Sequence, residues 1–310
     1  MLKIDAFAHI FTKEYGKRLM SLAPAVSKTF EFRRPSMTDI AIREDVMRRH
    51  PDILQIVTMG NVPLWRYVSV QDAIELSRIG NDEMAELVKT KPSLFYGAVG
   101  TIPIDDVDAS LKEIDYCINN LGLLGIQLYT TLERESLAEP KYRPIYELMA
   151  QLDRPIWIHP TADLSKPGYD KGMFSWLYES SRYMLDVVNA GLFKDFPDLK
   201  FIIHHAGGMV PHCRERVRCI MPKHEDRYFR NFYVDTALYG NAPGLMSAFD
   251  YYGADHMLFG TDAPLGGIAG SGCHGNTDQT IIAIDKMDIS DEDREKIYHG
   301  NAVRLFVVPA

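Results

Sequence analysis

The sequence predicts an α/β fold, a (β/α)8 TIM barrel in which residues 1–310 form a single domain. Three observations support this prediction. Eight short apolar runs alternate with helical segments, which is the pattern of parallel βαβ units. The chain is somewhat longer than a typical barrel, and no repeat, low-complexity segment or linker divides it. A doubly wound open sheet is the alternative, but it calls for a glycine-rich phosphate loop after the first strand, and the sequence has none there.

The predicted strands are runs of β-branched, aromatic and other apolar residues. Proline punctuates two of them, since Pro103 stops the third strand, and Pro155 and Pro160 bracket the fifth. In chain order the strands are Leu2–His9, Ile53–Met59, Leu94–Ile102, Leu123–Tyr129, Pro155–Pro160, Lys200–His205, Asn231–Thr236 and Met257–Asp262.

The predicted helices show apolar residues at helical spacing. Residues 10–35 lack this pattern and are expected to form a loop, long enough to be functional. Ser36 is a plausible N-cap for the first helix. In chain order the helices are Ser36–His50, Val70–Lys91, Asp106–Asn120, Lys141–Leu152, Trp176–Asn189, Gly207–Ile220 and Asn241–Tyr252, followed by two more at the end of the chain.

Composition excludes several classes of function. The net charge of -8, without a basic stripe, argues against binding nucleic acid. No apolar run approaches the roughly 20 residues that cross a bilayer, so we expect no membrane partner. The chain starts directly in a strand, and its 4 cysteines are scattered without a C-x-x-C pair. We therefore expect free thiols, no signal peptide and a cytoplasmic protein.

Four strands end in a polar residue that can do chemistry: His9, His159, His205 and Asp262. In a barrel the carboxyl ends of all strands surround one mouth, where active sites are built. One strand-end histidine is more often a hydrogen-bonded helper than a ligand, but four such residues favour a site. Two imidazoles and a carboxylate suit a catalytic zinc with an open position, and the ligand types also suit manganese or iron.

Several stretches resemble one family. They are I-D-A-F-A-H (4–9), the R-P-I-Y-E and L-D-R-P-I-W-I-H-P segments within 143–160, F-P-D-L-K-F-I-I-H-H-A-G-G (196–208), F-Y-V-D-T-A (232–237), M-L-F-G-T-D-A-P (257–264) and H-G-N-A-V-R-L-F (299–306). Together they resemble the amidohydrolase superfamily, in the branch of aminocarboxymuconate-semialdehyde decarboxylase and the aromatic-acid (resorcylate-type) decarboxylases. The resemblance implies a barrel of the metal-dependent-hydrolase type and covers nearly the whole chain.

The resemblance also implies a ligand set. The family's first strand carries an H-x-H pair, of which the second member is His9 and the first is replaced by Phe7. The expected ligands of one divalent metal, zinc or else manganese, are then His9, His159 and Asp262. The resemblance places the family's strand-six histidine, beside the metal, at His205.

Three residues near these ligands have assigned expectations. His204 is expected to alternate to the other side of its strand and pack between barrel and helix. Phe7 is expected to line the substrate pocket, or to fill the site of a lost metal. For Asp5 we expect a structural role.

The implied reaction is a decarboxylation, or another C–C lyase step, on a small aromatic or unsaturated cyclic carboxylic acid, with His205 and Asp262 handling protons. A metal-activated water attacking a lactone, an amide or a C–C bond is the hydrolase alternative. A metal-free barrel that binds a ligand is the third, and Phe7 is its best support.

Four further residues have expected places, three of them in the expected site. The resemblance implies a homodimer in which Arg216 binds the substrate carboxylate across the interface, and a solvated charge on a helix face is an equal alternative. Trp176 is expected to stack on a planar ring, and packing in the core is an equal alternative. His274 lies in the loop Gly266–Gly275, read as a lid. Arg43 is expected to be a surface charge.

Overall fold

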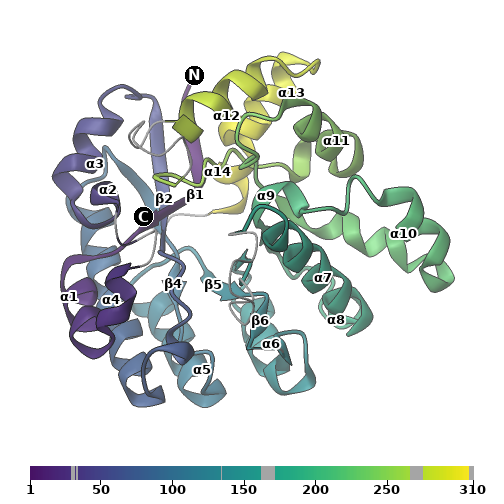
Figure 1. Ribbon diagram of the computed structural model, residues 1–310. Coiled ribbons are helices and arrows are strands. Elements are labelled where there is room, and N and C mark those ends of the chain that lie inside the picture. The colour runs from purple at the N-terminus through teal and green to yellow at the C-terminus, as the bar shows by residue number, and fades with distance from the viewer. Residues whose placement is uncertain (29–31, 33, 134, 162–171, 266–274, 307–310) are drawn as a thin grey trace.

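Parallel strands form the centre of the molecule in the computed structural model, which describes residues 1–28, 32, 34–133, 135–161, 172–265 and 275–306 (Figure 1). Two parallel sheets share the run 95–101, in which β3 and β4 are separated at Val99. Their strands are β1 (Lys3–Ile10), β2 (Ile53–Met59), β3 (Phe95–Ala98), β4 (Gly100–Thr101), β5 (Ile126–Tyr129), β8 (Ile156–His159), β9 (Phe201–Ile203) and β10 (Tyr233–Val234).

The run 257–263 closes the ring between β10 and β1. On one side the amide of Leu258 donates to the carbonyl of Val234 over 2.8 Å. On the other side the amide of Asp262 donates to the carbonyl of Phe7 over 3.0 Å, and Ala8 forms a parallel bridge with Ala263. Eight runs therefore surround one axis in chain order, and the predicted TIM barrel is confirmed.

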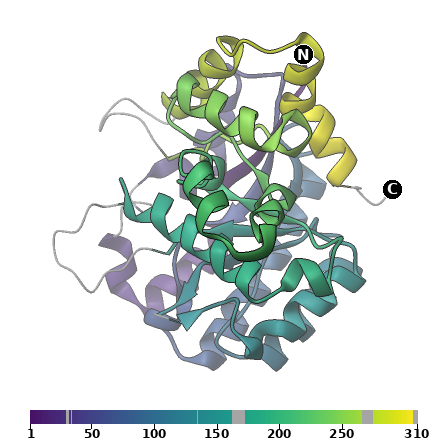
Figure 2. The same cartoon turned by 90° about the vertical axis from the view of Figure 1, so that its right-hand side faces the viewer.

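Helices surround these strands, with α3 and α4 on one side of Figure 1 and α7, α10 and α11 on the opposite side. The view in Figure 2 brings the green α10 and α11 to the front. The helices are α1 (Lys13–Leu22), α2 (Pro35–Thr38), α3 (Ile40–Met47), α4 (Val70–Thr90), α5 (Val107–Asp115), α6 (Arg143–Gln151), α7 (Ser175–Asn189), α8 (Leu192–Asp195), α9 (His204–Gly207), α10 (Arg214–Ile220), α11 (Ala242–Tyr252), α12 (Gly275–Asp285), α13 (Asp291–Glu295) and α14 (Asn301–Leu305). A small antiparallel pair, β6 (Thr131–Leu132) and β7 (Glu135–Ser136), follows β5.

The barrel interior is a separate apolar cluster from the layer between strands and helices. Its members in or next to the strands are Ile4, Ala6, Phe7, Ile56, Val99, Leu124, Trp157, Ile202 and Leu258. Trp157 is fully buried, and its indole Nε1 donates to the carbonyl of Ala6 over 2.8 Å. Phe306 stacks on the Trp157 ring at 5.0 Å and so covers the barrel interior opposite the mouth.

Three expectations about helices were wrong. The expected loop 10–35 contains α1, whose buried Tyr15 and Leu19 lie one turn apart. The expected first helix is broken at Asp39, whose carboxylate accepts from the amide of Ala41 over 2.8 Å and so begins α3. The expected helix from Gly207 begins only with α10, because Gly207 and Gly208 have φ of 74° and 64°.

In the described part of the chain, no helix combines the length and apolar character that crossing a membrane requires. Three of the cysteines lie there, Cys117, Cys213 and Cys219, and each is a free thiol.

Candidate active site

The predicted residues His9, His159 and Asp262 lie together at the carboxyl ends of β1, β8 and the run 257–263, and all three are buried. The ring centroids of His9 and His159 are 5.2 Å apart. His9 Nε2 lies 3.1 Å from Asp262 Oδ1. The ring of His204 follows β9 into the same cluster, 5.4 Å from the ring of His159. The convergence that the strand ends predicted is thus present.

Each of these three histidines is held through Nδ1. Thr58 Oγ1 on β2 lies 2.8 Å from His9 Nδ1. His159 Nδ1 donates to the carbonyl of Pro160 over 2.8 Å, and His204 Nδ1 donates to Asp235 Oδ2. Such contacts fix ring orientation and tautomer, as is usual for metal-binding histidines. The Nε2 atom of each ring is left as the ligand atom.

The unpartnered atoms of this cluster fit a divalent cation. His159 Nε2 and Asp262 Oδ2 are buried and make no hydrogen bond to any residue that the structure describes. A buried polar atom without a partner is costly, and functional sites are where such atoms occur. Ligand atoms of His9, His159 and His204 lie within 4.8 Å of one another, as do those of His204, His205 and Asp262. Imidazole nitrogen and carboxylate oxygen are the ligands that zinc and manganese accept.

Burial favours the neutral form of the His9 and His159 rings, which is the form that binds a metal. Burial lowers the pKa of His9, and burial together with the neighbouring histidines His9 and His204 lowers the pKa of His159 well below its usual value. Burial would also lower the pKa of His204, but the charges of Asp235 and Asp262 outweigh it and raise this pKa to about 10. The pKa of Asp262 lies below its usual range, because the hydrogen bonds and charges of His204 and His9 outweigh its burial. The two carboxylates therefore favour a positive charge at His204, which either a proton or a bound cation supplies.

The expectation for His204 was wrong. Ile202 points into the barrel, and Phe201 and Ile203 point toward the helices, so alternation places His204 inward. His205 nevertheless reaches the mouth, because β9 has ended and His205 itself is left-handed, with φ of 60°. Its ring lies 3.9 Å from that of His204 and is 5% exposed.

The two glycines after His205 make this turn possible. A Cβ on Gly208 would lie 2.4 Å from the carbonyl oxygen of Leu177 on α7. A Cβ on Gly207 would lie 2.4 Å from the hydroxyl of Tyr252 on α11. The turn at Gly207 and Gly208 thus packs closely between α7 and α11, and this packing fixes His204 and His205 at the mouth.

Phe7 lies inside the site. Its ring stacks on the His204 ring, with centroids 3.9 Å apart and an interplanar angle of 16°. The ring is also 5.4 Å from that of His9 and 6.1 Å from that of His159, both edge-on. Phe7 therefore forms one wall of the imidazole cluster.

A cavity of about 460 Å³ opens beside the cluster, with His205, Trp176, Leu238 and Tyr239 among its lining residues. The Trp176 ring lies 5.8 Å from the His159 ring and 5.7 Å from the His205 ring. Both ring nitrogens of His205 are without a hydrogen-bond partner among the described residues. A small planar ligand in this cavity would contact indole and imidazole together.

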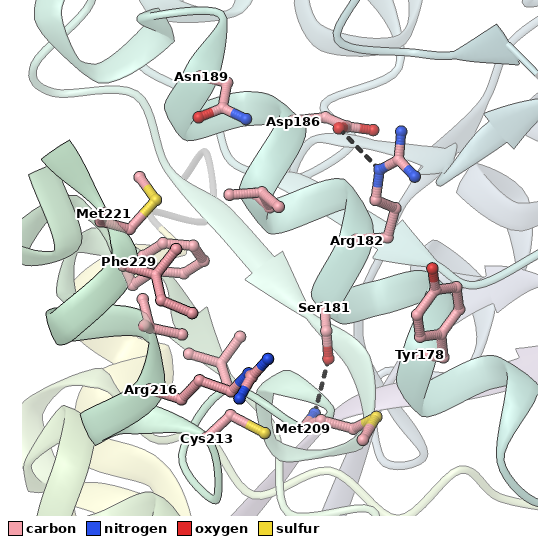
Figure 3. A pocket seen from close by; sticks show the side chains of 14 residues that line it. Tyr178, Ser181, Arg182, Asp186, Asn189, Met209, Cys213, Arg216, Met221 and Phe229 are labelled. Atoms are coloured by element: carbon pink, nitrogen blue, oxygen red, sulfur yellow. Dashed lines mark hydrogen bonds and ion pairs between the residues drawn. The ribbon is translucent and has the colours of Figure 1, made fainter.

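Arg216 does not lie at this mouth. It lines a separate groove of about 540 Å³ between α7 and α10, together with Met209, Cys213 and Phe229 (Figure 3). Arg182 and Asp186 pair on α7 at the rim of this groove over 3.0 Å. Within one chain, Arg216 is therefore outside the histidine cluster.

The other expected residues have different outcomes. His274 lies outside the described residues. Arg43 is 2% exposed rather than a surface charge: its guanidinium donates to the carbonyl of His9 and to Gln55 Oε1 on β2. Asp5 accepts hydrogen bonds from the amide and hydroxyl of Thr261, which joins β1 to the run 257–263 and agrees with the expected structural role.

Sequence reasoning missed two residues that orient the histidines, Thr58 and Asp235. Thr58 pairs with His9 in the register of β1 and β2. Asp235 Oδ1 also accepts from the amides of Ala206 and Ala237, both over 3.1 Å. The signal for Asp235 was present, because a carboxylate near the end of the seventh strand belongs to the same mouth.

Comparison with known proteins agrees with this geometry. A family profile described as amidohydrolase matches residues 69–308. The gamma-resorcylate decarboxylase of Polaromonas sp. is 27% identical, over 98% of each chain. The 2-keto-4-carboxy-3-hexenedioate hydratase of Sphingobium sp. is 29% identical, over 76% of this chain and 72% of the relative.

A solved structure of the dihydroxybenzoic acid decarboxylase from Polaromonas sp., with bound manganese and the inhibitor 2-nitroresorcinol, superposes with a TM-score of 0.82. It is 26% identical, over 98% of this chain and 96% of that one. Other relatives are likewise decarboxylases of aromatic acids. The family profile covers more than half of the sequence, and so the chain belongs to the amidohydrolase family and is an enzyme.

Proposed function

We propose that this enzyme is a metal-dependent decarboxylase of a small aromatic or unsaturated cyclic carboxylic acid. One observation carries the proposal: unpartnered ligand atoms of His159 and Asp262 lie beside a cavity lined by Trp176 and His205. The decarboxylase relatives support the reaction type.

In this proposal His9, His159 and Asp262 hold one divalent metal. Zinc suits the mixed nitrogen and oxygen ligands, and the manganese bound by the Polaromonas homologue makes manganese the other candidate. When bound, the metal supplies a Lewis acid that polarises substrate oxygens.

The side chains around the cavity bind the substrate ring and transfer the proton. Trp176 stacks on the planar ring of the substrate, and Phe7 keeps the inner wall apolar. Burial, together with the charge of His204, lowers the pKa of His205 to about 3, so its ring is neutral in the resting enzyme. A protonated His205 therefore gives up its proton more readily than an ordinary imidazolium, and the nearby carboxylate of Asp262 stabilises its charge.

His205 takes up a proton from solvent and donates it to the carbon bearing the carboxylate. The bond between that carbon and the carboxylate then breaks, its electron pair returns to the ring, and CO₂ leaves. The carboxylate R–COO⁻ and one proton become R–H and CO₂, and His205 is again neutral, so atoms and charges balance.

We also propose a cytoplasmic homodimer in which Arg216 of one protomer binds the substrate carboxylate of the other. The free thiols of Cys117, Cys213 and Cys219 support a reducing compartment. The groove that Arg216 lines is bordered by exposed Tyr178, Met209 and Ile220, which favours an interface. Light scattering tests the dimer, and a fully active monomer would contradict the role of Arg216.

A panel of hydroxylated benzoic acids and cyclic unsaturated acids tests the activity, with released CO₂ or bicarbonate as the readout. We expect CO₂ from at least one acid, and its loss in His159→Ala and in His205→Ala. Hydrolysis of lactones or amides without CO₂ would instead favour the hydrolase alternative. Ligand binding without turnover, unchanged in Asp262→Asn, would favour the metal-free barrel.

A hydratase is the second candidate function, because the Sphingobium relative bears that activity. Addition of water to a conjugated acid removes its ultraviolet absorbance without releasing CO₂. The same panel, read at both signals, separates the two reactions.

A further inference from the structure

Phe7 occupies the position at which the family resemblance implies the first histidine of an H-x-H pair. Phe7 is buried on β1, two residues before His9, and a phenyl ring has no ligand atom. A metal held by His9, His159 and Asp262 would then have two imidazoles from the protein. The structure shows where another imidazole is available.

His204 lies directly against Phe7, its ring stacked on the phenyl ring at 3.9 Å. Its Nε2 is 3.3 Å from Asp262 Oδ1, and His9 Nε2 is 3.1 Å from the same oxygen. The Nε2 atoms of His9 and His204, which come from different parts of the barrel, therefore lie near the same oxygen of Asp262. His159 joins them, because ligand atoms of all three histidines lie within 4.8 Å of one another.

Asp235 holds the His204 ring in one orientation through its carboxylate. Its Oδ2 accepts from His204 Nδ1, and its Oδ1 accepts from the amides of Ala206 and Ala237. With three donors the carboxylate is fixed in place, and the His204 ring has one direction in which Nε2 can point. A carboxylate behind an imidazole is the arrangement that orients metal ligands in proteins.

We propose, on the basis of the function above, that His204 supplies a third imidazole ligand in place of the one absent at position 7, with Asp235 as its positioning residue. The ligand set is then His9, His159, His204 and Asp262. Phe7 serves as the flat surface against which the His204 ring is stacked. His205 is left free of the metal, with both ring nitrogens available at the cavity.

Pulsed EPR of the wild-type protein loaded with Mn²⁺ tests this directly, because the couplings count the imidazole nitrogens bound to the ion. Three are expected. Two would overturn the inference and leave the metal site of the proposed function standing. Failure of the wild type to bind Mn²⁺ or Zn²⁺ would overturn both, so the two failures are distinguishable.

Affinity measurements on variants give an independent test, by competition of the metal-free protein with a chelator for Zn²⁺. We expect His204→Ala to weaken binding at least 100-fold and Asp235→Asn to weaken it roughly 10- to 100-fold. His212→Ala, on an exposed turn, is the matched control and should bind as the wild type does.

The double variant Phe7→His/His204→Ala returns an imidazole to β1 while removing that of His204. It should recover at least about 10-fold of the affinity lost in His204→Ala, which a merely misfolded variant would not do. Wild-type affinity in His204→Ala, or no recovery in the double variant, would contradict the exchange of ligands between the two positions.

Discussion

Asp5 provides a quantitative test of how the base of the site is held. Its carboxylate is fully buried and accepts from the amide of Thr261 over 2.9 Å and from its hydroxyl over 2.6 Å. Burial raises the pKa of Asp5 from 3.8 to about 6, although the hydrogen bonds from Thr261 act in the opposite direction. Asp5→Asn keeps the size of the side chain and removes the ionisation.

The direction of the pH effect follows from this pKa. Between about pH 4 and pH 6 the folded protein holds the Asp5 proton and the unfolded chain does not. The stabilisation from this group is complete below about pH 4 and is lost as the pH rises through about 6. A difference of about 2 pH units corresponds to about 3 kcal/mol. The free energy of unfolding of the wild type, minus that of Asp5→Asn, should therefore fall by about 3 kcal/mol across this window.

Urea unfolding followed by tryptophan fluorescence between about pH 4 and pH 8 measures this difference, and other titrating groups cancel because both proteins contain them. Asp45→Asn is the control, because that carboxylate is 76% exposed on α3. A difference between wild type and Asp5→Asn that stays constant with pH, or that rises, would refute the assignment of a desolvated carboxyl group at this position.

Three other predictions concern the site and its supports. Trp176→Ala should raise KM for an aromatic acid roughly 5-fold with a smaller change in kcat, since stacking contributes about 1 kcal/mol; steady-state kinetics check this, and Trp176→Phe should keep most of the affinity. Arg43→Ala should lower the free energy of unfolding by about 3 kcal/mol in urea, because buried carbonyl and amide oxygens on β1 and β2 lose a charged donor. Gly208→Ala should cost about 2 kcal/mol or more in thermal unfolding, because its φ is 64° and the new Cβ would meet the carbonyl oxygen of Leu177 at 2.4 Å. Gly191→Ala, with φ of 71° and no atom closer than 3.8 Å, is its control and should cost about half as much.

The polar residues at the strand ends were predictable because each apolar run indicates both a buried strand and the position of its last residue. In Ile156–His159 the β-branched and aromatic residues indicate a buried strand, and the terminal histidine indicates the mouth of a barrel. The same holds for the run that ends in Asp262. Parallel strands bring these ends together whatever their distance along the chain, so the cluster followed from topology alone.

His204 and His205 show that a sequence pattern alone does not determine which way the side chains at a strand end point. Ile202 and Ile203 are equally apolar, so their letters do not say which of them faces the barrel axis. The answer depends on where β9 ends and on the left-handed backbone at His205. Helix α1 was not predicted for a related reason. A short helix with few apolar positions is stabilised by tertiary packing, which the spacing of apolar residues in the sequence does not show.

A phenyl ring at position 7 does not by itself prevent metal binding at the proposed site, because side chains from several strand ends face the same mouth of a barrel. Strand β1, which carries Phe7, and strand β9, which directly precedes His204, are not neighbours in either sheet. Their ends nonetheless face the same axis, and the two rings are in contact at 3.9 Å. In the proposed ligand set His204 can therefore act where the side chain at position 7 cannot, because Asp235 orients its ring. Phe7 supports this arrangement, because its ring is buried and packs against the ring of His204.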